Sequence, residues 1–219
     1  MSPDWSLTRF GPLTALCVMA AAPEYGPALQ ARIRPLITGV GPIEAAAATA
    51  HALAGLAVAG TLPDVIVSLG SAGSRTLDHA RVYRVGQVSY RDMDASPLGF
   101  PKGETPYPRL PAILPLAEGP AALAAVRLSS GGGVVSGLGY DGIDADMVDM
   151  ETFAVVRAAA RFGLPVIGLR GVSDGRTDLS ALEHWTDALA EIDQRLAEAL
   201  DLLPDHFSLT SPILQTEPA

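Results

Sequence analysis

The sequence is poor in the features that mark several classes of protein. It has a single cysteine, Cys17, so no intrachain disulfide can form, and the apolar residues around it predict a buried thiol. Lys and Arg number 15 against 24 Asp and Glu, which gives a net charge of −9 without any basic stripe. This balance disfavours nucleic acids and anionic membranes as partners. No apolar run reaches the ~18–20 residues that a membrane-spanning helix needs.

Motifs for metals, nucleotides and serine nucleophiles are also missing. The four histidines have no metal-ligand spacing and no C-x-x-C is present, so we expect no metal and no cofactor. Neither the Walker A pattern nor the dinucleotide pattern G-x-G-x-x-G occurs. Ser71 follows Leu69-Gly70, which departs from the G-x-S-x-G context of a nucleophile elbow, so a serine hydrolase is disfavoured.

The residues that are present indicate one α/β domain. The 219 residues are 48% hydrophobic and 18% charged, which is typical of a globular chain with a sizeable core. Apolar strand-like runs alternate with helical segments, so we expect a mixed, mostly parallel central sheet flanked by helices. The domain is predicted over 13–203, between an N-terminal extension (1–12) and a C-terminal tail without structure (204–219). Strands are expected at Leu13–Met19, 34–38, 64–69, 86–90, 134–136, 147–150 and 165–172, and helices at 43–59, 151–162 and 180–203.

The first apolar run has two interpretations. Leu13–Met19 precedes three alanines at 20–22, which loosely imitates a signal peptide and its cleavage site. However, the preceding segment carries Asp4 and only one Arg, which a signal peptide does not favour. We therefore expect a first core strand and a cytoplasmic protein.

Three carboxylates follow predicted strands, and strand ends are where open α/β sheets place their ligands. Glu151 is either an acid favoured by the dipole of the helix that it begins, or a group that accepts hydrogen bonds from a ribose diol. Asp174 is either a turn residue or a general acid with a raised pKa. Glu24 is either a solvated residue at a helix start or a general base acting on water.

Two further segments have the composition of ligand-binding loops. Gly70-Ser71-Ala72-Gly73 follows a buried strand and is either a tight turn or a place where backbone N–H groups approach a ligand. The segment 95–111 is rich in Pro and Gly without periodicity, and a loop of this length in a compact domain is usually functional.

The segments 70–73, 148–151 (VDME) and 170–174 (RGVSD), in this order and spacing, resemble the 5′-methylthioadenosine/S-adenosylhomocysteine nucleosidases of the purine nucleoside phosphorylase superfamily. The resemblance runs from about Leu13 to about Leu203. Weaker support comes from 20–24, 38–41, 90–94 and 136–140. It implies the superfamily's fold and a small nucleoside as the substrate.

The resemblance also implies roles for individual residues. Glu24 matches the acid that activates the attacking water, and Asp174 matches the acid that protonates adenine N7. Contacts to the water, the sugar or the base are implied for Ser71, Ala72, Gly73, Tyr140, Met150, Glu151, Arg170 and Ser173. Leu98, Phe100 and Pro106 match a loop that lines the neighbouring subunit's alkylthio pocket, which implies a homodimer.

The implied activity is hydrolysis of methylthioadenosine, S-adenosylhomocysteine or 5′-deoxyadenosine with release of adenine. A phosphorylase of the same fold is one alternative, and Arg91 is the residue that favours it. A non-catalytic nucleoside-binding module is another, although it would need neither Glu24 nor Asp174. The connections 24–39 and 140–147 are shorter than in the family pattern, Asp149 replaces the usual Glu, and Asp141 stands where an apolar residue is usual. A nucleosidase for a different base or 5′ group, such as futalosine or a hopanoid precursor, therefore stays open.

Overall fold

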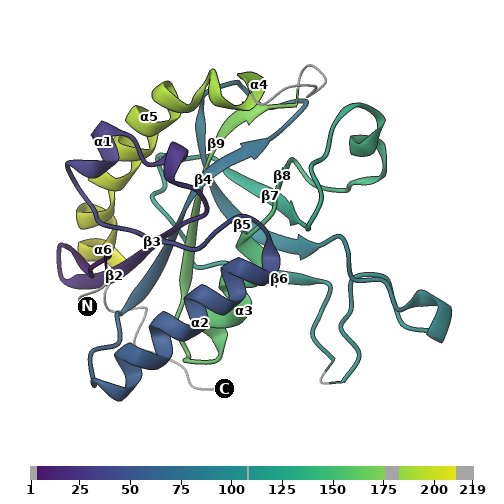
Figure 1. Cartoon of the computed structure of the whole chain (residues 1–219), viewed down its shortest axis with the longest axis horizontal. Helices are drawn as coiled ribbons and strands as arrows, with labels where there is room; N and C mark the ends of the chain where they lie inside the picture. Colours follow the sequence, from purple (N-terminus) through teal and green to yellow (C-terminus); the bar gives the residue numbers. More distant parts are fainter. Residues whose placement is uncertain (1–3, 108, 176–182, 211–219) are drawn as a thin grey trace.

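A mixed sheet of nine strands forms the centre of the computed structural model, which describes residues 4–107, 109–175 and 183–210. The strands are β1 (Thr8–Phe10), β2 (Leu13–Met19), β3 (Leu36–Ile37), β4 (Val65–Gly73), β5 (Val82–Tyr90), β6 (Ile113–Pro115), β7 (Ala125–Ser130), β8 (Met147–Asp149) and β9 (Val166–Asp174). β2 pairs in parallel with β3 and β4, and β4 pairs in parallel with β9 (Figure 1). The expected α/β fold with a mixed central sheet is confirmed.

Part of the sheet closes on itself. β9 pairs with β5, β5 with β7, and β7 with β8, and β8 returns to β4 through the pair Gly73 and Val148. This circuit brings the carboxyl ends of β4, β8 and β9 together. Ligand sites of α/β sheets are expected at such ends.

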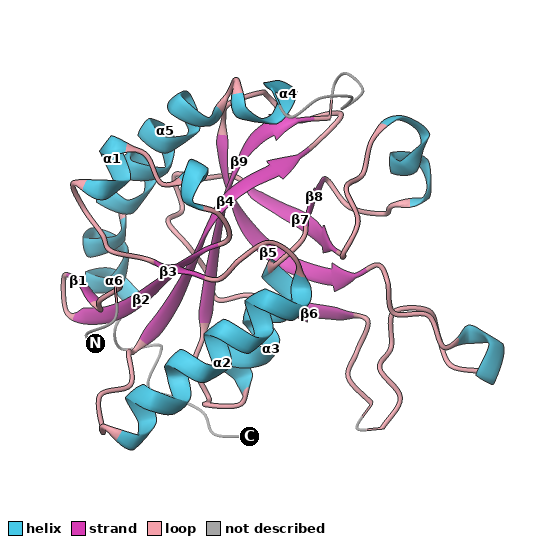
Figure 2. Cartoon of the chain, viewed as in Figure 1, coloured by secondary structure: helices cyan, strands magenta, loops and turns pink. Residues whose placement is uncertain are grey.

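Helices cover both faces of the sheet, as Figure 2 shows. The helices are α1 (Pro27–Gln30), α2 (Pro42–Val58), α3 (Thr152–Ala160), α4 (Glu183–Thr186), α5 (Leu189–Asp201) and α6 (Leu203–Thr210), and three short 3-10 turns span Ala22–Glu24, Ser96–Leu98 and Gly137–Gly142. α1, α5 and α6 pack on one face through a core that includes Leu29, Leu196 and Phe207. α2 and α3 pack on the other face, against β2 and β4.

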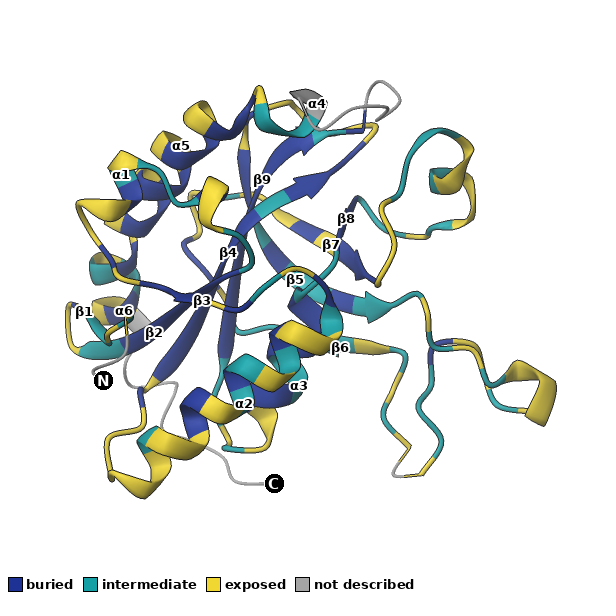
Figure 3. Cartoon of the chain, in the orientation of Figure 1, coloured by how far each residue is buried: buried dark blue, intermediate teal, exposed yellow. Residues whose placement is uncertain are grey.

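The buried strands explain why the pattern of the first half was informative. β2 is apolar and buried from Ala15 to Met19, because both of its faces are covered (Figure 3). Cys17 is fully buried in it, as predicted. α2 begins at Pro42, which suits the first turn of a helix because its missing N–H would be unpaired there. Both elements lie within one residue of their predicted positions.

Several predicted elements differ from the structure. The expected strand at 134–136 is irregular, and the strand of this region is β7, which precedes the three glycines. Residues 70–73 form the end of β4 and are not a turn after it. The expected helix 180–203 is divided into α4 and α5 within the described residues, while 180–182 lie outside them.

The chain ends also carry structure that the sequence did not predict. β1 pairs antiparallel with β2 inside the expected N-terminal extension. α6 occupies the first part of the expected tail, and its Phe207 is fully buried in the core formed with α5. The predicted lack of structure from Pro204 is therefore wrong as far as Thr210, because an aromatic side chain anchors this segment.

Candidate active site

A cavity of about 580 Å³ opens where the strands end. Its wall comes from the segments after β2, β7 and β8, the last residues of β4 and β9, and helix α4. The predicted residues among those that line it are Glu24, Ser71, Ala72, Gly73, Met150, Glu151, Ser173 and Asp174. The fold thus brings together residues separated by 150 positions in the chain.

Glu24 ends the short 3-10 turn after β2, and its side chain is buried. The Oε1 atom accepts hydrogen bonds from the Ser71 backbone N–H at 2.8 Å and from the Ser71 hydroxyl at 2.6 Å. The Oε2 atom has no hydrogen-bond partner among the described residues. Burial raises the pKa of Glu24 above its ordinary value, while the Ser71 donors and the charge of Arg170 oppose this effect.

A second, small space adjoins Glu24. It measures about 10 Å³, close to the ~10–15 Å³ that one water molecule requires. Glu24, Ser71, Glu151 and Arg170 all line it. Of these four residues, Glu24, Ser71 and Arg170 are the ones that the sequence resemblance places near the attacking water, and Glu151 is the one that it places on the ribose hydroxyls.

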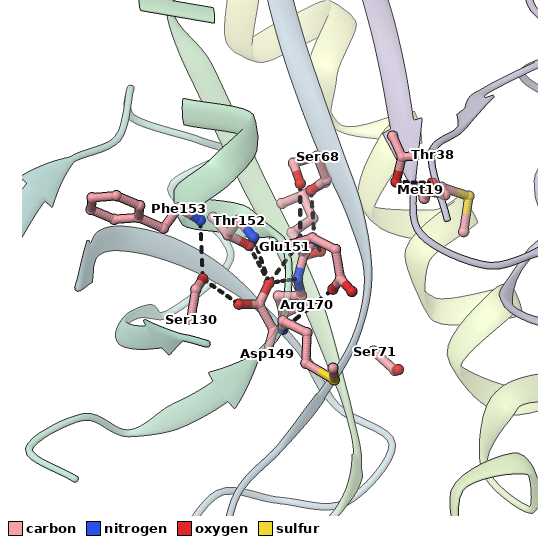
Figure 4. Close-up of polar contacts among 12 residues, drawn as sticks. Met19, Thr38, Ser68, Ser71, Ser130, Asp149, Glu151, Thr152, Phe153 and Arg170 are labelled. Atoms are coloured by element: carbon pink, nitrogen blue, oxygen red, sulfur yellow. Dashed lines mark hydrogen bonds and ion pairs between the residues drawn. The ribbon is translucent and has the colours of Figure 1, made fainter. Parts of the chain in front are cut away.

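Arg170 of β9 forms the centre of a buried network around Asp149, drawn in Figure 4. Its guanidinium lies 3.1 Å from the Asp149 carboxylate and also donates to Thr152 and to the backbone and hydroxyl of Ser68. Thr152 and Ser130 donate to the same carboxylate. Asp149 is the carboxylate that pairs with Arg170, and sequence reasoning did not place it in the site. Its position at the end of β8, just before Met150-Glu151, could have indicated it.

Glu151 lies at the start of α3 and reaches across to the loop before α2. Its Oε1 atom accepts the Gly41 N–H at 2.7 Å, and its Oε2 atom accepts the Met150 N–H at 3.3 Å. Burial, together with the neighbouring Asp149 carboxylate, raises the pKa of Glu151 to about 7. Protonated and ionised Glu151 are therefore both populated near neutral pH.

Asp174 closes β9 on the far side of the cavity. Its Oδ2 atom accepts the Ser173 hydroxyl at 2.6 Å. Burial raises the pKa of Asp174, and the Ser173 hydrogen bond and His79 oppose the rise. A side chain at position 73 would lie 2.7 Å from Asp174 Oδ1. Gly73 is therefore required here for close packing.

Tyr140 projects toward the same place from the 3-10 turn at Gly137–Gly142. Its hydroxyl is buried beside Gly73 and has no hydrogen-bond partner among the described residues. Arg75 lies over the ring at 5.3 Å from its centroid and also pairs with Asp141. Burial and the nearby Asp174 raise the pKa of the Tyr140 hydroxyl. The structure thus directs the phenol oxygen toward the Asp174 side of the cavity.

Arg91 is the residue that the sequence analysis gave as a possible phosphate ligand. Its guanidinium donates hydrogen bonds to backbone carbonyls. One terminal nitrogen donates to the carbonyls of Ser129 and Asp149 at 2.6 and 2.9 Å. The other donates to the carbonyls of Gly131 and Gly133 at 3.0 and 2.7 Å. All four terminal N–H groups are therefore used, and Arg91 holds the loop after β7 in place.

Trp185 of helix α4 is a cavity residue that sequence reasoning missed. Its indole N–H donates to the Ser71 hydroxyl oxygen at 2.9 Å. No motif marks this tryptophan, because its role depends on how α4 folds back over the end of β4.

The three residues predicted for a partner's pocket lie away from this cavity. Leu98, Phe100 and Pro106 belong to the segment 91–112, which projects from the sheet between β5 and β6 (Figure 1). Leu98 is 78% exposed. The structure therefore does not bring them together with Glu24 and Asp174 in one protomer.

The part of the chain that the structure describes has neither a metal-binding cluster nor a membrane-spanning helix. Among residues 4–107, 109–175 and 183–210, no group of three or more His, Cys, Asp or Glu side chains is arranged to hold a metal. Within the same part of the chain, no helix is long and apolar enough to cross a membrane.

Comparison with known proteins agrees with this geometry. The family described as "Phosphorylase superfamily" matches residues 32–203. A 5′-methylthioadenosine/S-adenosylhomocysteine nucleosidase of Actinobacillus succinogenes is 30% identical over 64% of this chain and 66% of its own length. A nucleosidase of the same name from Staphylococcus aureus strain JH9 is 27% identical over 74% and 78%.

Solved structures share the fold. A futalosine hydrolase mutant of Helicobacter pylori superimposes with a TM-score of 0.73 at 19% identity, over 88% of this chain and 98% of its own. A methylthioadenosine/S-adenosylhomocysteine nucleosidase of Colwellia psychrerythraea in complex with adenine gives 0.71 at 18% identity, over 92% and 98%. The chain belongs to the phosphorylase superfamily, and the predicted resemblance to its nucleosidase branch is confirmed.

Proposed function

We propose that this protein is an N-glycosyl hydrolase that releases adenine from 5′-substituted adenosines such as methylthioadenosine, S-adenosylhomocysteine and 5′-deoxyadenosine. One observation carries the proposal. The unpartnered Oε2 atom belongs to a buried Glu24, and a space that fits a single water molecule adjoins this residue. A carboxylate in this position suits the removal of a proton from water.

The proposed reaction uses the three carboxylates in different ways. Glu24 takes a proton from water as the water oxygen forms a bond to the ribosyl carbon. The bond from this carbon to adenine breaks, and its electron pair leaves with the base. Asp174, whose protonated form is favoured by burial, gives a proton to adenine N7. Glu151 accepts hydrogen bonds from the ribose hydroxyls and orients the sugar.

Phosphorolysis is the main alternative, and the charges of the cavity oppose it. Glu24, Asp149, Glu151 and Asp174 all line the cavity, and Arg91 is the single cation among its described lining residues. The four terminal N–H groups of Arg91 are bound to backbone carbonyls. A phosphate dianion would lie beside the carboxyl groups of Glu24 and Glu151, and the terminal N–H groups of Arg91 that could bind it already donate to carbonyls, whereas neutral water would not be repelled.

A non-catalytic binding module explains fewer of these features. Burial of Glu24 and Asp174 is unfavourable to their charged forms and raises both pKa values. Binding alone would not require this cost, whereas a proton-transfer site needs shifted groups. We therefore favour an enzyme.

A related hydrolase for a 6-oxopurine nucleoside is the second candidate. The buried Tyr140 hydroxyl, without a partner among the described residues, lies on the Asp174 side of the site. A phenol can donate to an oxo group as well as accept from an amino group. Both base classes therefore belong in the substrate panel.

The 5′ side of the site is proposed to be completed by a second copy of the chain. Leu98, Phe100 and Pro106 project on the 91–112 segment, away from their own cavity, as a residue lent to a partner would. We further propose a cytoplasmic location. Leu13–Met19, the run that imitates a signal peptide, is the buried strand β2, so cleavage after it would remove a core strand.

Chromatography of the products tests the proposal. The protein is incubated with methylthioadenosine, 5′-deoxyadenosine and an inosine analogue, with and without phosphate, and free base and sugar are quantified. We expect adenine and methylthioribose at equal rates in both buffers. Methylthioribose 1-phosphate formed only with phosphate would establish phosphorolysis instead.

The variant Asp174→Asn tests the assignment of the general acid. An amide cannot give up a proton to adenine, so we expect turnover to fall by roughly 10²-fold or more. Circular dichroism and the melting temperature should stay close to the wild type, because Asn can still accept the Ser173 hydrogen bond. Turnover near the wild-type rate in a folded variant would remove Asp174 from this role.

A further inference from the structure

A chain of two hydrogen bonds connects helix α4 to the proposed base. The Trp185 indole N–H lies 2.9 Å from the Ser71 hydroxyl oxygen, and this hydroxyl lies 2.6 Å from Glu24 Oε1. The three residues come from three separate parts of the chain. They meet only because α4 folds over the carboxyl end of β4.

The chemistry of the indole fixes the direction of both hydrogen bonds. An indole nitrogen is a donor and never an acceptor, so Ser71 must offer a lone pair to Trp185. Its single hydroxyl proton is then directed to the other neighbour, Glu24. The Ser71 backbone N–H donates to the same Oε1 atom at 2.8 Å. Oε1 therefore faces two donors, whereas Oε2 has no partner among the described residues.

We propose that Trp185 is a positioning residue for hydrolysis, which holds the Ser71 hydroxyl as a donor to Glu24 Oε1 and so reserves Oε2 for the proton of the attacking water. The inference rests on the proposed function and deepens it. A proton on Oε1 would face the Ser71 backbone N–H and the Ser71 hydroxyl, which both donate to this atom. A proton on Oε2 leaves both hydrogen bonds intact.

The same arrangement stabilises the ionised base. Glu24 is buried, and its hydrogen bonds with Ser71 oppose the effect of burial on its pKa. Without Trp185 the Ser71 hydroxyl is free to rotate and spends part of its time away from Glu24. Glu151 and Arg170 also face the water-sized space beside Glu24, and Glu151 ionises on the same acidic limb of the pH–rate profile. The part of that limb that reports ionisation of Glu24 then moves to higher pH.

The alternative is that Trp185 only forms an apolar wall of the cavity. In that role it would contribute to substrate affinity and leave the ionisation of Glu24 unchanged. The variant Trp185→Phe separates the two roles, because it keeps an aromatic ring and removes the N–H group. Trp5→Phe is the matched control, since it makes the same substitution at a partly buried position packed against the core between β2 and α2.

The experiment measures Glu24 directly and through catalysis. Protein labelled with 13C at the glutamate carboxyl carbon is titrated by NMR, and the Glu24 signal is identified by its loss in Glu24→Gln. Steady-state rates with methylthioadenosine are measured across the same pH range. Both measurements are made on the wild type, Trp5→Phe, Trp185→Phe, Ser71→Ala and the double variant Trp185→Phe/Ser71→Ala.

We expect Trp185→Phe to raise the Glu24 midpoint by roughly 0.5–1 pH unit, as loss of part of a hydrogen bond to a charged group would. The acidic limb of the rate profile should move in the same direction and by no more than the Glu24 midpoint, because Glu151 also ionises on it, and kcat should fall by about 3–10-fold. Ser71→Ala should shift the midpoint at least as far. The double variant should show no further shift beyond Ser71→Ala, because Trp185 acts through Ser71.

Three results are distinguished. A change of KM alone, with the Glu24 midpoint where it is in the wild type, overturns the positioning role. Additive shifts in the double variant overturn the route through Ser71. If the midpoints move as expected but wild-type protein cleaves no nucleoside, the proposed function fails while the contact between Trp185, Ser71 and Glu24 is supported.

Discussion

At the scale of single residues, the carboxylates that line the cavity differ in the groups that bind them. Glu24 is balanced by two Ser71 donors and by the charge of Arg170, and Asp174 has one donor, Ser173. Asp149 is different, because Arg170 neutralises it in a buried ion pair. A buried pair of this kind gives little net stability but is costly to break. Its value here is to hold Arg170 beside the water-sized space.

Glu151 gives a pH-dependent prediction for stability. Its pKa is about 7 in the folded protein, against 4.5 for an unperturbed glutamate side chain. Between these values the folded protein keeps a proton that the unfolded chain has lost, so stability falls as pH rises through this window. Glu151→Gln cannot ionise, and its free energy of unfolding relative to wild type should therefore increase from pH 5 to pH 8, on the order of 2 kcal/mol.

Urea unfolding at pH 5, 6, 7 and 8 measures this difference. Glu44→Gln removes an equal charge from the exposed first turn of α2 and controls for net charge. A relative stability of Glu151→Gln that is the same at pH 5 and pH 8 would contradict the prediction. A positive result would mean that ionised Glu151, the proposed sugar-binding acid, destabilises the protein, as functional sites commonly do.

At the scale of elements, the position of the Glu24 segment depends on a contact from α5. The Asp193 carboxylate accepts backbone N–H groups of Gly26, Ala28 and Leu29 at 3.1, 2.8 and 3.1 Å. It therefore acts as an N-terminal cap for α1, supplied by another helix. Because α1 begins at Pro27, three residues after Glu24, the cap also fixes the position of Glu24, the proposed general base.

Asp193→Ala should destabilise the protein by roughly 2–3 kcal/mol, because three partly or fully buried N–H groups lose their acceptor. Asp201→Ala is the matched control. Asp201 lies on the same helix and pairs with Arg32 at the surface, where such pairs contribute about 0–1 kcal/mol. Chemical denaturation compares the two. Equal losses would show that the cap adds nothing beyond a surface pair.

Elements with a strong local pattern were predictable, and those defined by distant neighbours were not. β2 and α2 agree with prediction because a continuous apolar run and a proline-led alanine helix carry their own signal. β7 was missed because the alternation in its sequence AVRLSS spans only four residues, 126–129, and its pairing with β5 and β8 is not visible in the sequence. Glu24, Glu151 and Asp174 could be proposed as site residues from their positions after predicted strands, whereas the Asp149–Arg170 pair and the contact of Trp185 depend on residues distant in the chain.

At the scale of the whole molecule, the segment 91–112 carries exposed apolar side chains that no contact within one chain covers among the described residues. Leu98 and Tyr107 are 78% and 88% exposed, and the Tyr107 ring makes an edge contact with Phe100 at a centroid distance of 6.0 Å. Apolar side chains gathered on a projecting arm are unfavourable in water unless a partner covers them. In the proposed homodimer, a second copy of the chain covers these side chains, and the arm lies near the cavity of that copy.

Leu98→Arg should weaken this association by at least about tenfold in the dimer dissociation constant, since it places a charge in a buried apolar contact. Leu209→Arg is the matched control, because Leu209 is 80% exposed on α6, far from the arm in the chain. Sedimentation measures the dimer, and KM is followed during dilution. If the arm completes the 5′ side, KM should rise as Leu98→Arg dissociates and stay constant for Leu209→Arg. A Leu98→Arg protein that remains dimeric with unchanged KM would place the interface elsewhere and leave the cavity complete within one chain.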